Sequence, residues 1–551
     1  MEQLRAGAIV VQLQEAGLGA VTCAGVEVLR GLTLPVRNAD WGTCLTEILS
    51  VKTTATTHTR RFACRSGTFT GHFDVTLTDA CLVAEVEITF PAPVLINRAG
   101  FTLLHPIRGV AGQPMTLRHP DGTTTDTRFP ALISPAQPAR DIAGMAHVVN
   151  GVVVNIAMEG EVFEMEDQRN WSDASFKTYC RTLSLPYPYS VAAGEVIRQR
   201  ITLTLTAGQA GGLDVAPVVP PVARLPQVLL PQVLLAHESG LSSVAGLAAF
   251  PGLPVQLRLD RGTPATDLQA LAARPGLALE IVFDDLPDLD RQIARAKAAG
   301  LHPVQLAALP RAYLKSHQPD GQWPGGAQPA DAIARLRAAC PMAAVGGGSL
   351  TNFTELNRCR PDRGSVDFVT FGNTAIVHAA DDLSVWQTLE ALPDILASAL
   401  AISAGKPLHL GLVSIGMRCN PYGDRTAPNP DRLRLPMTMD DPRQMTGFAA
   451  AYAVAVLATA ARAGVESLAL AMPDGPLGAH GALGDVIRAA HALAGRQVTI
   501  TDAGGLVVIR AGDRALVANC TTEPLHPPGL PALAPESAYA FTSSPRDLAD
   551  D

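Results

Sequence analysis

The sequence predicts a multidomain α and β protein with an N-terminal β-sandwich or supersandwich, a central (β/α)8 TIM-like barrel and a small C-terminal β domain. The chain has 551 residues, which is too many for one hydrophobic core. Its first part alternates apolar and polar positions in short runs, whereas its middle part alternates apolar runs with segments of helical period. We place the three domains at residues 1–222, 223–494 and 495–551.

The N-terminal part is expected to be almost entirely β-structure. Turn residues separate short runs rich in Val, Ile, Thr and Phe, and this regular spacing is typical of a sandwich. A Gly- and Pro-rich segment at residues 206–235 then marks a domain boundary near residue 222. The expected strands are 26–32, 68–77, 82–90, 148–158 and 196–205.

The middle part, about 270 residues of alternating strands and helices, favours a barrel over a dinucleotide-binding sheet, because no phosphate-binding Gly fingerprint follows its first strand. Seven of the eight expected strands are clear. The first strand of the barrel is either 227–236 or 255–259, and in the second case the eighth strand is not recognisable in the sequence. Asp441 followed by Pro442 predicts a helix start. The clear strands are 255–259, 277–283, 303–309, 342–346, 366–371, 408–415 and 467–472, and the expected helices are 267–273, 289–299, 329–339, 385–404, 441–463 and 482–493.

The last part returns to β-structure at residues 497–502, 506–510 and 515–519. Three strands are too few to stand alone. We therefore expect them to pack on the barrel or to complete the first sandwich.

Composition limits the classes of function. The net charge is -8 and no basic run occurs, so nucleic acid and anionic membranes are unexpected partners. Nine Cys without a Cys-x-x-Cys spacing, no secretory signal and no apolar run of membrane length predict a cytoplasmic protein. No metal-binding cluster, P-loop or nucleophile elbow is apparent, so no cofactor or metal is expected. Self-association into a homo-oligomer is left open.

Residues 164–179 interleave charges with large aromatic side chains. A buried strand could not hold these charges unpaired, because desolvation of each is costly. We interpret the stretch as an internally paired polar cluster at the mouth of a site for a small, hydroxyl-rich molecule; the alternative is a solvated loop with an aromatic anchor. Its polar residues are Glu164, Glu166, Asp167, Arg169, Asn170, Asp173 and Lys177, and its aromatic residues are Trp171, Phe176 and Tyr179.

In a barrel the functional site lies at the C-terminal ends of the strands. After the strand at 342–346 come three glycines, which are expected to let the backbone approach a ligand, and then Glu355 and Asn357. Glu355 is a candidate general base, although a carboxylate at this place can also simply cap a helix.

Later loops add further candidates. His378, Asn420 and Tyr422 are candidates to bind substrate hydroxyls. Asp474 could be a second carboxylate, but Asp-Gly is also a common turn. Glu355 with Asp474 would make the carboxylate pair of a barrel glycosidase.

A second hypothesis places the reaction in the first domain. His105, Asp167, Arg169 and Lys177 could form a polar pocket there, with the barrel as a scaffold. The two hypotheses use different domains, and sequence alone leaves both open.

Three segments carry a family resemblance: residues 101–106 (Phe-Thr-Leu-Leu-His-Pro), residues 166–179, and the Gly346-Gly-Gly motif with residues 353–358 (Phe-Thr-Glu-Leu-Asn-Arg). Together with the three-part layout, they resemble the D-apionate lactonase family over essentially the whole chain. The resemblance implies a bacterial hydrolase that opens D-apionolactone to D-apionate in the catabolism of the plant sugar apiose. It also implies an aromatic residue and a Glu at the end of the late barrel strand, where this sequence has Ala471-Met472-Pro473-Asp474. The second carboxylate is therefore either lost or supplied by Asp474.

We accordingly expect a metal-independent sugar-acid lactonase, a carboxylic ester hydrolase whose partner is a small sugar lactone. The alternatives are a barrel glycoside hydrolase that acts on apiosides and a non-catalytic sugar-acid binder. The candidate catalytic residues are Glu355, Asp167 and Asp474, and the candidate substrate-binding residues are Arg169, Lys177, His105, Asn357, His378, Asn420 and Tyr422.

Overall fold

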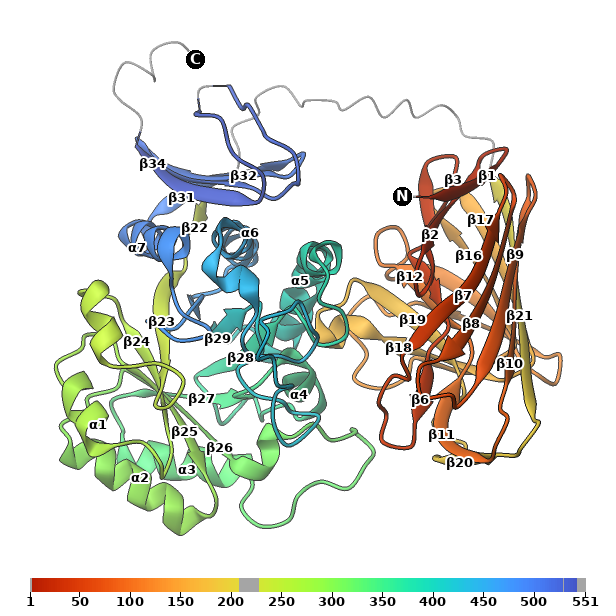
Figure 1. Ribbon diagram of the computed structural model, residues 1–551. Helices are drawn as coiled ribbons and strands as arrows, with labels where there is room; N and C mark the ends of the chain where they lie inside the picture. The colour runs from red at the N-terminus through yellow and green to blue at the C-terminus, as the bar shows by residue number, and fades with distance from the viewer. Residues whose placement is uncertain (1, 208–226, 529, 543–551) are drawn as a thin grey trace. The chain divides into compact units, whose positions relative to one another are not determined.

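The computed structural model describes residues 2–207, 227–528 and 530–542, and the chain divides into two compact units (Figure 1). The first unit comprises Met1–Gln168 and Ala174–Val218, and the second comprises Arg169–Asp173 and Val219–Asp551. The short segment Arg169–Asp173 therefore belongs with the barrel. The predicted boundary at residue 222 lies outside the described residues.

The first unit contains two nine-stranded antiparallel sheets and a smaller three-stranded sheet, which confirms the predicted sandwich. In spatial order, one sheet consists of β1 (Gln3–Ala6), β2 (Ile9–Gln14), β3 (Gly17–Cys23), β5 (Gly31–Thr33), β12 (Thr102–Pro106), β19 (Ser175–Cys180), β18 (Phe163–Asp167) and β15 (Ala139–Ile142), with β4 (Val26–Leu29) paired to β3. The other consists of β14 (Thr124–Arg128), β13 (Pro114–Arg118), β16 (Gly144–Val149), β17 (Val152–Glu159), β21 (Val196–Ala207), β10 (Cys81–Thr89), β9 (Thr70–Leu77), β8 (Thr57–Cys64) and β7 (Thr46–Thr53). The small sheet consists of β20 (Tyr189–Val191), β11 (Val94–Ala99) and β6 (Val36–Asn38).

Aromatic side chains fill the space between the two large sheets. Alternate residues of the strands are buried, as in β17, because successive side chains of a strand point to opposite faces. The rings of Phe73 and Phe101 meet edge to face at 6.2 Å, and those of Phe129 and Phe176 lie 5.1 Å apart. All four side chains are almost fully buried.

One predicted strand proves to be a hairpin. Residues 148–158 were expected to form a single strand, but β16 ends at Val149 and β17 begins at Val152. Asn150 and Gly151 form the turn with positive φ angles of 44° and 85°. An Asn-Gly pair is the preferred sequence for such a two-residue turn, so the sequence itself carries the signal for this hairpin.

The second unit contains a closed barrel of eight parallel strands, as predicted (Figure 1). The first strand corresponds to the candidate at 227–236, although it begins at Gln232. The strands are β23 (Gln232–Glu238), β24 (Val255–Leu259), β25 (Ala278–Phe283), β26 (Gln305–Pro310), β27 (Ala344–Gly348), β28 (Phe368–Thr374), β29 (Leu408–Ser414) and β30 (Ser467–Ala469).

Helices alternate with these strands. The predicted start at Asp441 is wrong for the long helix: Asp441 caps only a short 3-10 turn, and Thr446 caps α6 by accepting a bond from Phe448 N at 3.3 Å. The α-helices are α1 (Ala265–Leu271), α2 (Leu286–Ala298), α3 (Pro329–Ala339), α4 (Phe353–Arg358), α5 (Asp382–Ser403), α6 (Gly447–Ala463) and α7 (Gly481–Leu493). The 3-10 turns whose residues all belong to this unit are η2 (Ala245–Ala249), η3 (Arg311–Leu314) and η4 (Pro442–Met445). A further 3-10 turn, η1 (Gln168–Trp171), precedes β19.

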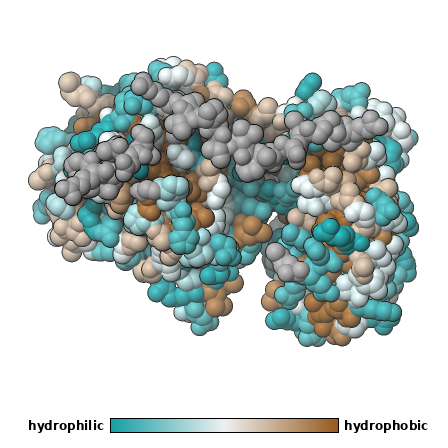
Figure 2. All heavy atoms as spheres, turned by 90° about the horizontal axis from the view of Figure 1, so that it is seen from above, coloured by the Kyte–Doolittle hydropathy of each residue, from teal (hydrophilic) through white to brown (hydrophobic). Residues whose placement is uncertain are grey.

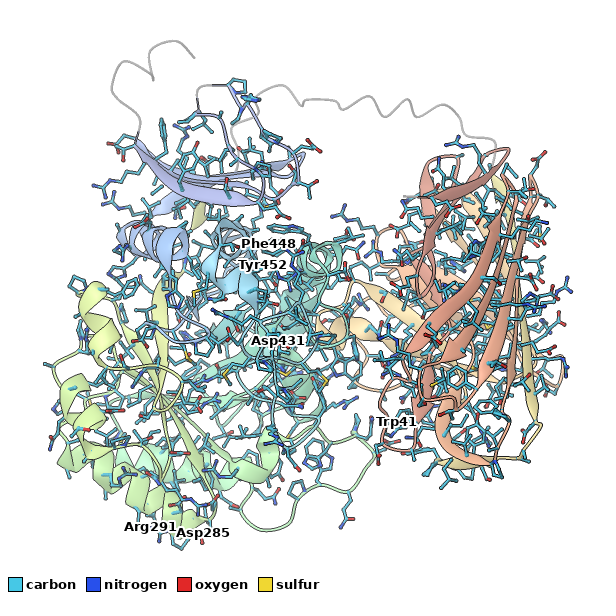
Figure 3. All side chains as sticks on the ribbon, viewed as in Figure 1. Trp41, Asp285, Arg291, Asp431, Phe448 and Tyr452 are labelled. Atoms are coloured by element: carbon cyan, nitrogen blue, oxygen red, sulfur yellow. The ribbon has the colours of Figure 1, made fainter. Side chains whose placement is uncertain are left out.

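Helices α5 and α6 pack through aromatic side chains. Phe448 and Tyr452, labelled in Figure 3, lie on successive turns of α6 and contact Trp386 of α5. The Phe448 and Trp386 rings stack with centroids 4.3 Å apart. Tyr452 also shares a hydrogen bond of 3.0 Å with Thr388, so its buried hydroxyl is paired.

The C-terminal strands pack on α6 and α7, in agreement with one of the two predicted placements. They join a sheet with β22 (Val228–Leu229), in the order β22, β31 (Gln497–Ala503), β32 (Leu506–Ala511), β33 (Arg514–Asn519) and β34 (Ser537–Thr542). Strand β34 was not predicted. Whether residues 495–551 form a separate domain stays a prediction.

The surface of each unit mixes hydrophilic and apolar residues in the view of Figure 2. Among the described residues, no helix combines the length and the apolar character that a membrane crossing requires.

Candidate functional site

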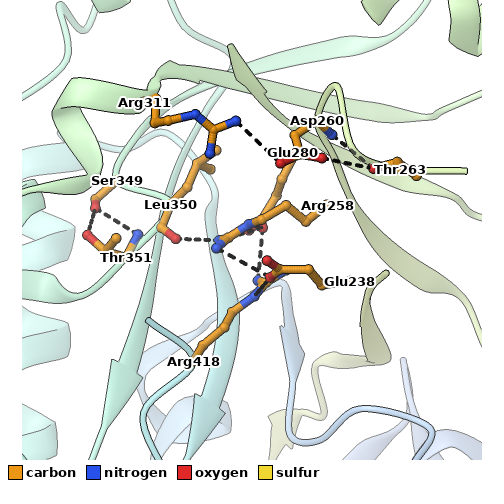
Figure 4. A network of polar contacts seen from close by, with 10 residues as sticks. All are labelled: Glu238, Arg258, Asp260, Thr263, Glu280, Arg311, Ser349, Leu350, Thr351 and Arg418. Atoms are coloured by element: carbon orange, nitrogen blue, oxygen red, sulfur yellow. Dashed lines mark hydrogen bonds and ion pairs between the residues drawn. The ribbon is translucent and has the colours of Figure 1, made fainter. Parts of the chain in front are cut away.

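Three neighbouring barrel strands and one later loop hold a largely buried network of two arginines and two glutamates (Figure 4). Arg258 of β24 donates from Nε and Nη2 to Glu280 Oε2 of β25, at 3.0 and 2.9 Å. Arg418, after β29, donates from Nη1 to the same oxygen at 3.0 Å. Its Nε donates to Glu238 Oε2, at the end of β23, at 2.7 Å. The formal charges cancel within the network.

Ion pairing keeps Arg258 and Glu238 charged. Burial works to lower the pKa of Arg258, but Glu280 and Glu238 outweigh it and raise the pKa above its ordinary value. Burial works to raise the pKa of Glu238, but Arg418 and Arg258 outweigh it and hold the pKa below its ordinary value. Loss of one partner from a buried pair typically costs about 3–5 kcal/mol, so the four side chains are held in one arrangement.

Sequence reasoning missed these four residues, although a signal was present for two of them. Arg258 is flanked by two leucines, and Glu280 by Leu and Ile, within predicted strands. Alternate residues of a barrel strand face the interior. A charge within such an apolar run is expensive unless it is paired, and it therefore marks a position with a polar partner.

Glu355 is the third residue of α4 and forms a capping box with Asn352. Its Oε2 accepts hydrogen bonds from Asn352 N and Thr351 Oγ1, each at 3.0 Å. Its Oε1 is buried and makes no hydrogen bond of ordinary length and angle with any described residue. The residue is only 5% exposed. Glu355 therefore caps the helix and also keeps one oxygen for another partner.

The surroundings of Glu355 favour its protonated form. Burial raises the pKa of Glu355 above its ordinary value, and the bonds from Asn352 and Thr351 oppose this rise without cancelling it. Ser316, whose hydroxyl accepts from Arg358 Nη1 at 3.0 Å, opposes it as well. A carboxylate with a raised pKa is a stronger base once it is ionised, which suits a general base.

Two partly buried groups lie within electrostatic reach of Glu355. Burial raises the pKa of the Cys419 thiol, the two arginines of the network oppose that rise, and Glu238 and Glu355 add to it. Burial, together with the charge of Glu355, raises the pKa of Tyr422 well above its ordinary value. Cys419 is thus within electrostatic reach of both Glu355 and the network.

A small enclosed cavity of about 20 Å³ lies against these groups. Glu280, Arg418 and Cys419 line it together with Thr351 and Asn352, the residues that bind Glu355. This volume is enough for one water molecule. The cavity is therefore the innermost part of the site and not the place of a whole sugar.

The glycines before Glu355 serve barrel packing, and their expected role in letting the backbone approach a ligand stays a prediction. A Cβ on Gly346 would lie 2.2 Å from the Phe368 ring. Gly348 has φ +132°, and a Cβ there would lie 2.2 Å from Thr370 O. Both glycines lie in β27, where only a residue without a side chain fits against β28.

The segment Arg169–Asp173 contacts helix α4 and the end of β28. Asn357 Nδ2 donates to Asn170 Oδ1 at 2.9 Å, and Ser172 Oγ donates to Asn373 Oδ1 at 2.6 Å. Asn357, a predicted substrate-binding residue, thus holds this segment.

His378, another predicted substrate-binding residue, contacts the same segment. Its Nδ1 lies 2.6 Å from Asp173 Oδ2, and its ring meets that of Trp171 edge-on at 5.6 Å. Trp171 is 8% exposed and packs against Met417. The His378 side chain is 36% exposed, so it remains open to a ligand.

Arg169 lies in the interior and pairs with α5. Its Nη1 is 2.7 Å from Asp394 Oδ2, and its side chain is fully buried. Asn420 shapes the loop after β29, because its Oδ1 accepts from Tyr422 N at 2.9 Å and from Gly423 N at 3.1 Å. Tyr422 also places its hydroxyl 3.4 Å from the Thr354 hydroxyl. Of these predicted residues, Tyr422 lies nearest to the helix that carries Glu355.

Asp474 is tied to the loop after β23. Its Oδ1 accepts from Ser243 N at 2.7 Å and its Oδ2 accepts from Ser243 Oγ at 2.5 Å. Both carboxylate oxygens are engaged there, and among the described residues no bond joins Asp474 to Glu355.

Asp167 and Lys177 lie in the first unit, on the hairpin of β18 and β19. Asp167 is fully buried, and its Oδ2 accepts from Ser134 N at 3.0 Å. Lys177 Nζ lies 2.5 Å from Glu166 Oε2, its cross-strand neighbour. Both charges have partners within the unit: the Lys177–Glu166 pair is internal to residues 164–179, as expected, whereas Ser134 lies outside that stretch.

His105 lies in the core between the two large sheets. Its Nε2 is 2.9 Å from Thr178 Oγ1, and its ring is 5.9 Å from that of His147. Burial, with a smaller contribution from His147, lowers the pKa of His105 to about 3. His105 is therefore neutral near pH 7 and is enclosed by protein, which suits packing better than catalysis.

Among the residues that the structure describes, no group of three or more His, Cys, Asp and Glu side chains could hold a metal ion.

Comparison with known proteins covers both units. Residues 1–208 match the family described as D-apionate lactonase, N-terminal domain, and residues 252–499 match D-apionate lactonase, TIM barrel domain. The chain is 38% identical over 510 residues to a D-apionate lactonase of Brucella anthropi, with 86% of this chain and 83% of that protein covered. Among solved structures, a β-arabinopyranosidase matches with 10% identity and a TM-score of 0.29 over 95% of this chain and 91% of that chain. A putative aldose 1-epimerase of Escherichia coli K12 matches with 9% identity and a TM-score of 0.27 over 37% of this chain and 98% of that chain.

Proposed function

This chain belongs to the D-apionate lactonase family, and from that premise we propose that it hydrolyses D-apionolactone to D-apionate in the catabolism of apiose. The chain is then a lactonase, a carboxylic ester hydrolase that acts on a small sugar lactone. The site at the barrel mouth supports this function, because it offers one base and several hydrogen-bond donors.

The observation that carries the assignment of the site is the second oxygen of Glu355, Oε1. Oε1 is buried, makes no ordinary hydrogen bond with any described residue and belongs to a carboxylate whose pKa burial raises. We assign Glu355 as the general base that deprotonates the attacking water. Of the three predicted carboxylates, it alone has a buried oxygen without a hydrogen bond of ordinary geometry among the described residues, whereas Asp167 and Asp474 bind the amides of Ser134 and Ser243.

Other predicted residues take supporting roles in this proposal. His378 is open to a ligand and is proposed to bind a hydroxyl of the sugar ring. Asn357 and Asn420 are proposed to act indirectly, because they hold the 169–173 segment and the loop after β29. Tyr422 places its hydroxyl near Thr354 of α4 and is proposed to contact the substrate.

Lactone opening requires fewer catalytic groups than glycoside hydrolysis does. One base and one oxyanion donor are sufficient for water to attack the ring ester. A glycosidase needs a separate acid and a second carboxylate at a defined distance. The engagement of Asp474 by Ser243 gives the glycosidase alternative no support.

Proton release tests the function directly. The purified chain is mixed with D-apionolactone and a panel of aldonolactones in weak buffer with a pH indicator, with and without a chelator. We expect acidification that is fastest with D-apionolactone. New reducing ends from apiosides without lactone turnover would support a glycosidase instead, and thermal stabilisation by the lactone without turnover would support a non-catalytic binder.

The wider setting stays a prediction. We propose that the enzyme acts in the cytoplasm of a bacterium, without a cofactor or a nucleic-acid partner. Size-exclusion chromatography with light scattering would determine whether it forms a homo-oligomer.

A further inference from the structure

We propose that Arg418 is a second catalytic residue of this barrel, which donates a hydrogen bond from Nη2 to the lactone carbonyl oxygen and to the oxyanion that forms from it. The inference rests on the proposed lactonase function and names a group of the same site that the sequence did not indicate.

The first observation is an unused donor on a buried charge. Arg418 has a side chain that is only 9% exposed. Glu238 and Glu280 take its Nε and Nη1. Its Nη2 is buried and has no hydrogen-bond partner among the described residues. A buried guanidinium donor without an acceptor is costly, and such a group is kept where a ligand supplies the acceptor.

The second observation is that the donor is held in place before any substrate arrives. Glu280 binds both Arg418 and Arg258, and Arg258 also donates to Leu350 O, as Figure 4 shows. Glu238 fixes the other edge of the Arg418 guanidinium. Donors that need no reorganisation stabilise a developing charge most effectively. Glu238, Glu280 and Arg258 are therefore positioning residues for Arg418.

The third observation is that the donor lines the same cavity as Thr351 and Asn352, the two residues that bind the base. Arg418 lines the small cavity together with Thr351, and Thr351 donates to Glu355. Cys419, next to Arg418, is within electrostatic reach of Glu355. A carbonyl group bound at this cavity could therefore meet Arg418 on its oxygen while Glu355 acts on the water.

The chemical step balances with these two residues. Glu355 removes a proton from water, and the water oxygen bonds to the carbonyl carbon. The π electrons move to the carbonyl oxygen, and this oxyanion accepts a hydrogen bond from Arg418 Nη2. When the tetrahedral intermediate collapses, the bond between that carbon and the ring oxygen breaks. The protonated Glu355 returns its proton to the departing alkoxide. The product is an open-chain hydroxy acid, which ionises and can keep the same bond to Arg418.

The test compares Arg418→Gln with a charge-balanced double variant, Glu238→Gln/Arg418→Gln, because the single change leaves an uncompensated glutamate. Initial rates on D-apionolactone are measured by proton release, and folding is measured by thermal unfolding. Both variants are expected to lose about 100- to 1,000-fold in kcat, the typical effect of one lost oxyanion donor, with a much smaller change in KM. In Arg418→Ala, added methylguanidine is expected to restore part of kcat.

Arg443→Gln is the matched control. Arg443 is equally buried and pairs with two carboxylates, Asp441 and Asp382, but it does not line the cavity. The control is expected to lower the unfolding temperature while kcat per folded molecule stays near that of the wild type.

The outcomes separate this inference from the proposed function. If the wild type hydrolyses the lactone and the folded double variant keeps kcat within about threefold, or if methylguanidine restores nothing, Arg418 is not the oxyanion donor. If the wild type hydrolyses no lactone at all, the proposed function fails and this inference fails with it.

Discussion

Thr351 Oγ1 donates a hydrogen bond of 3.0 Å to Glu355 Oε2 and fixes one oxygen of a carboxylate whose other oxygen stays buried without an ordinary partner among the described residues. The same carboxylate closes the capping box of α4. Glu355 thus gains a defined orientation from the helix that it caps, and this orientation fixes the direction in which its second oxygen, Oε1, points.

Replacement of Thr351 by Val should shift the pH dependence of the reaction. The hydroxyl lowers the pKa of Glu355 against the effect of burial, so its loss should raise that pKa further. The acid limb of the kcat/KM profile should then move to higher pH. Thr388→Val, which removes a buried hydroxyl between α5 and α6, is the control and should leave the limb in place. An unmoved limb in Thr351→Val would show that another group limits the rate at low pH.

The pH dependence of stability should also report Glu355. Its folded-state pKa lies above the ordinary value, so the folded chain binds this proton more tightly than the unfolded chain. The associated stability is present at low pH and is lost as the pH rises from the ordinary value through the folded pKa. In urea unfolding, Glu355→Gln should therefore become more stable relative to the wild type as the pH rises through that window. A difference that is constant across the window would contradict the raised pKa.

The first unit should lose stability in acid because of His105. Its pKa is lowered to about 3, so between its ordinary pKa and about 3 the unfolded chain binds a proton that the folded chain does not. Stability should fall as the pH decreases through this range. His105→Gln should flatten the fall when unfolding is followed by circular dichroism at several pH values. An equally steep fall in the variant would assign the effect elsewhere, for example to His147, whose pKa burial lowers to about 4.

Gly348→Ala should disturb the strand that leads to Glu355. The added Cβ would lie 2.2 Å from Thr370 O at a φ of +132°. Overpacking of this kind typically costs about 1–3 kcal/mol, and the strained backbone adds to it. Gly325→Ala, where a Cβ meets nothing within 4 Å, is the control. Equal unfolding temperatures for the two variants would contradict the packing role of Gly348.

The layout of the fold could be predicted from the sequence because its signals are local. Period-two runs predicted the sandwich, and apolar runs that alternate with helical segments predicted the barrel. Errors arose where one local signal hid another. The Asn150-Gly151 turn was absorbed into a long β-rich run, and Pro442 suggested a helix start that Thr446 in fact provides.

The candidate site was predictable only in part. Glu355 could be proposed because it follows a barrel strand directly. Arg418 and Glu238 could not be paired by sequence reasoning, because they are 180 residues apart and meet only when the barrel closes. His105 and Lys177 looked functional because charge and aromaticity cluster in the sequence, yet their partners Thr178 and Glu166 are neighbours across strands of one sheet.

The central claim is that Glu355 deprotonates the water that opens the lactone. Glu355→Gln is the most direct test, because Gln also forms a capping box and should preserve α4. Initial rates of proton release from D-apionolactone should fall about 100- to 10,000-fold in kcat, the usual range for loss of a general base, while the unfolding temperature stays close to that of the wild type. A folded Glu355→Gln variant that turns over the lactone at a near-normal rate would contradict the account.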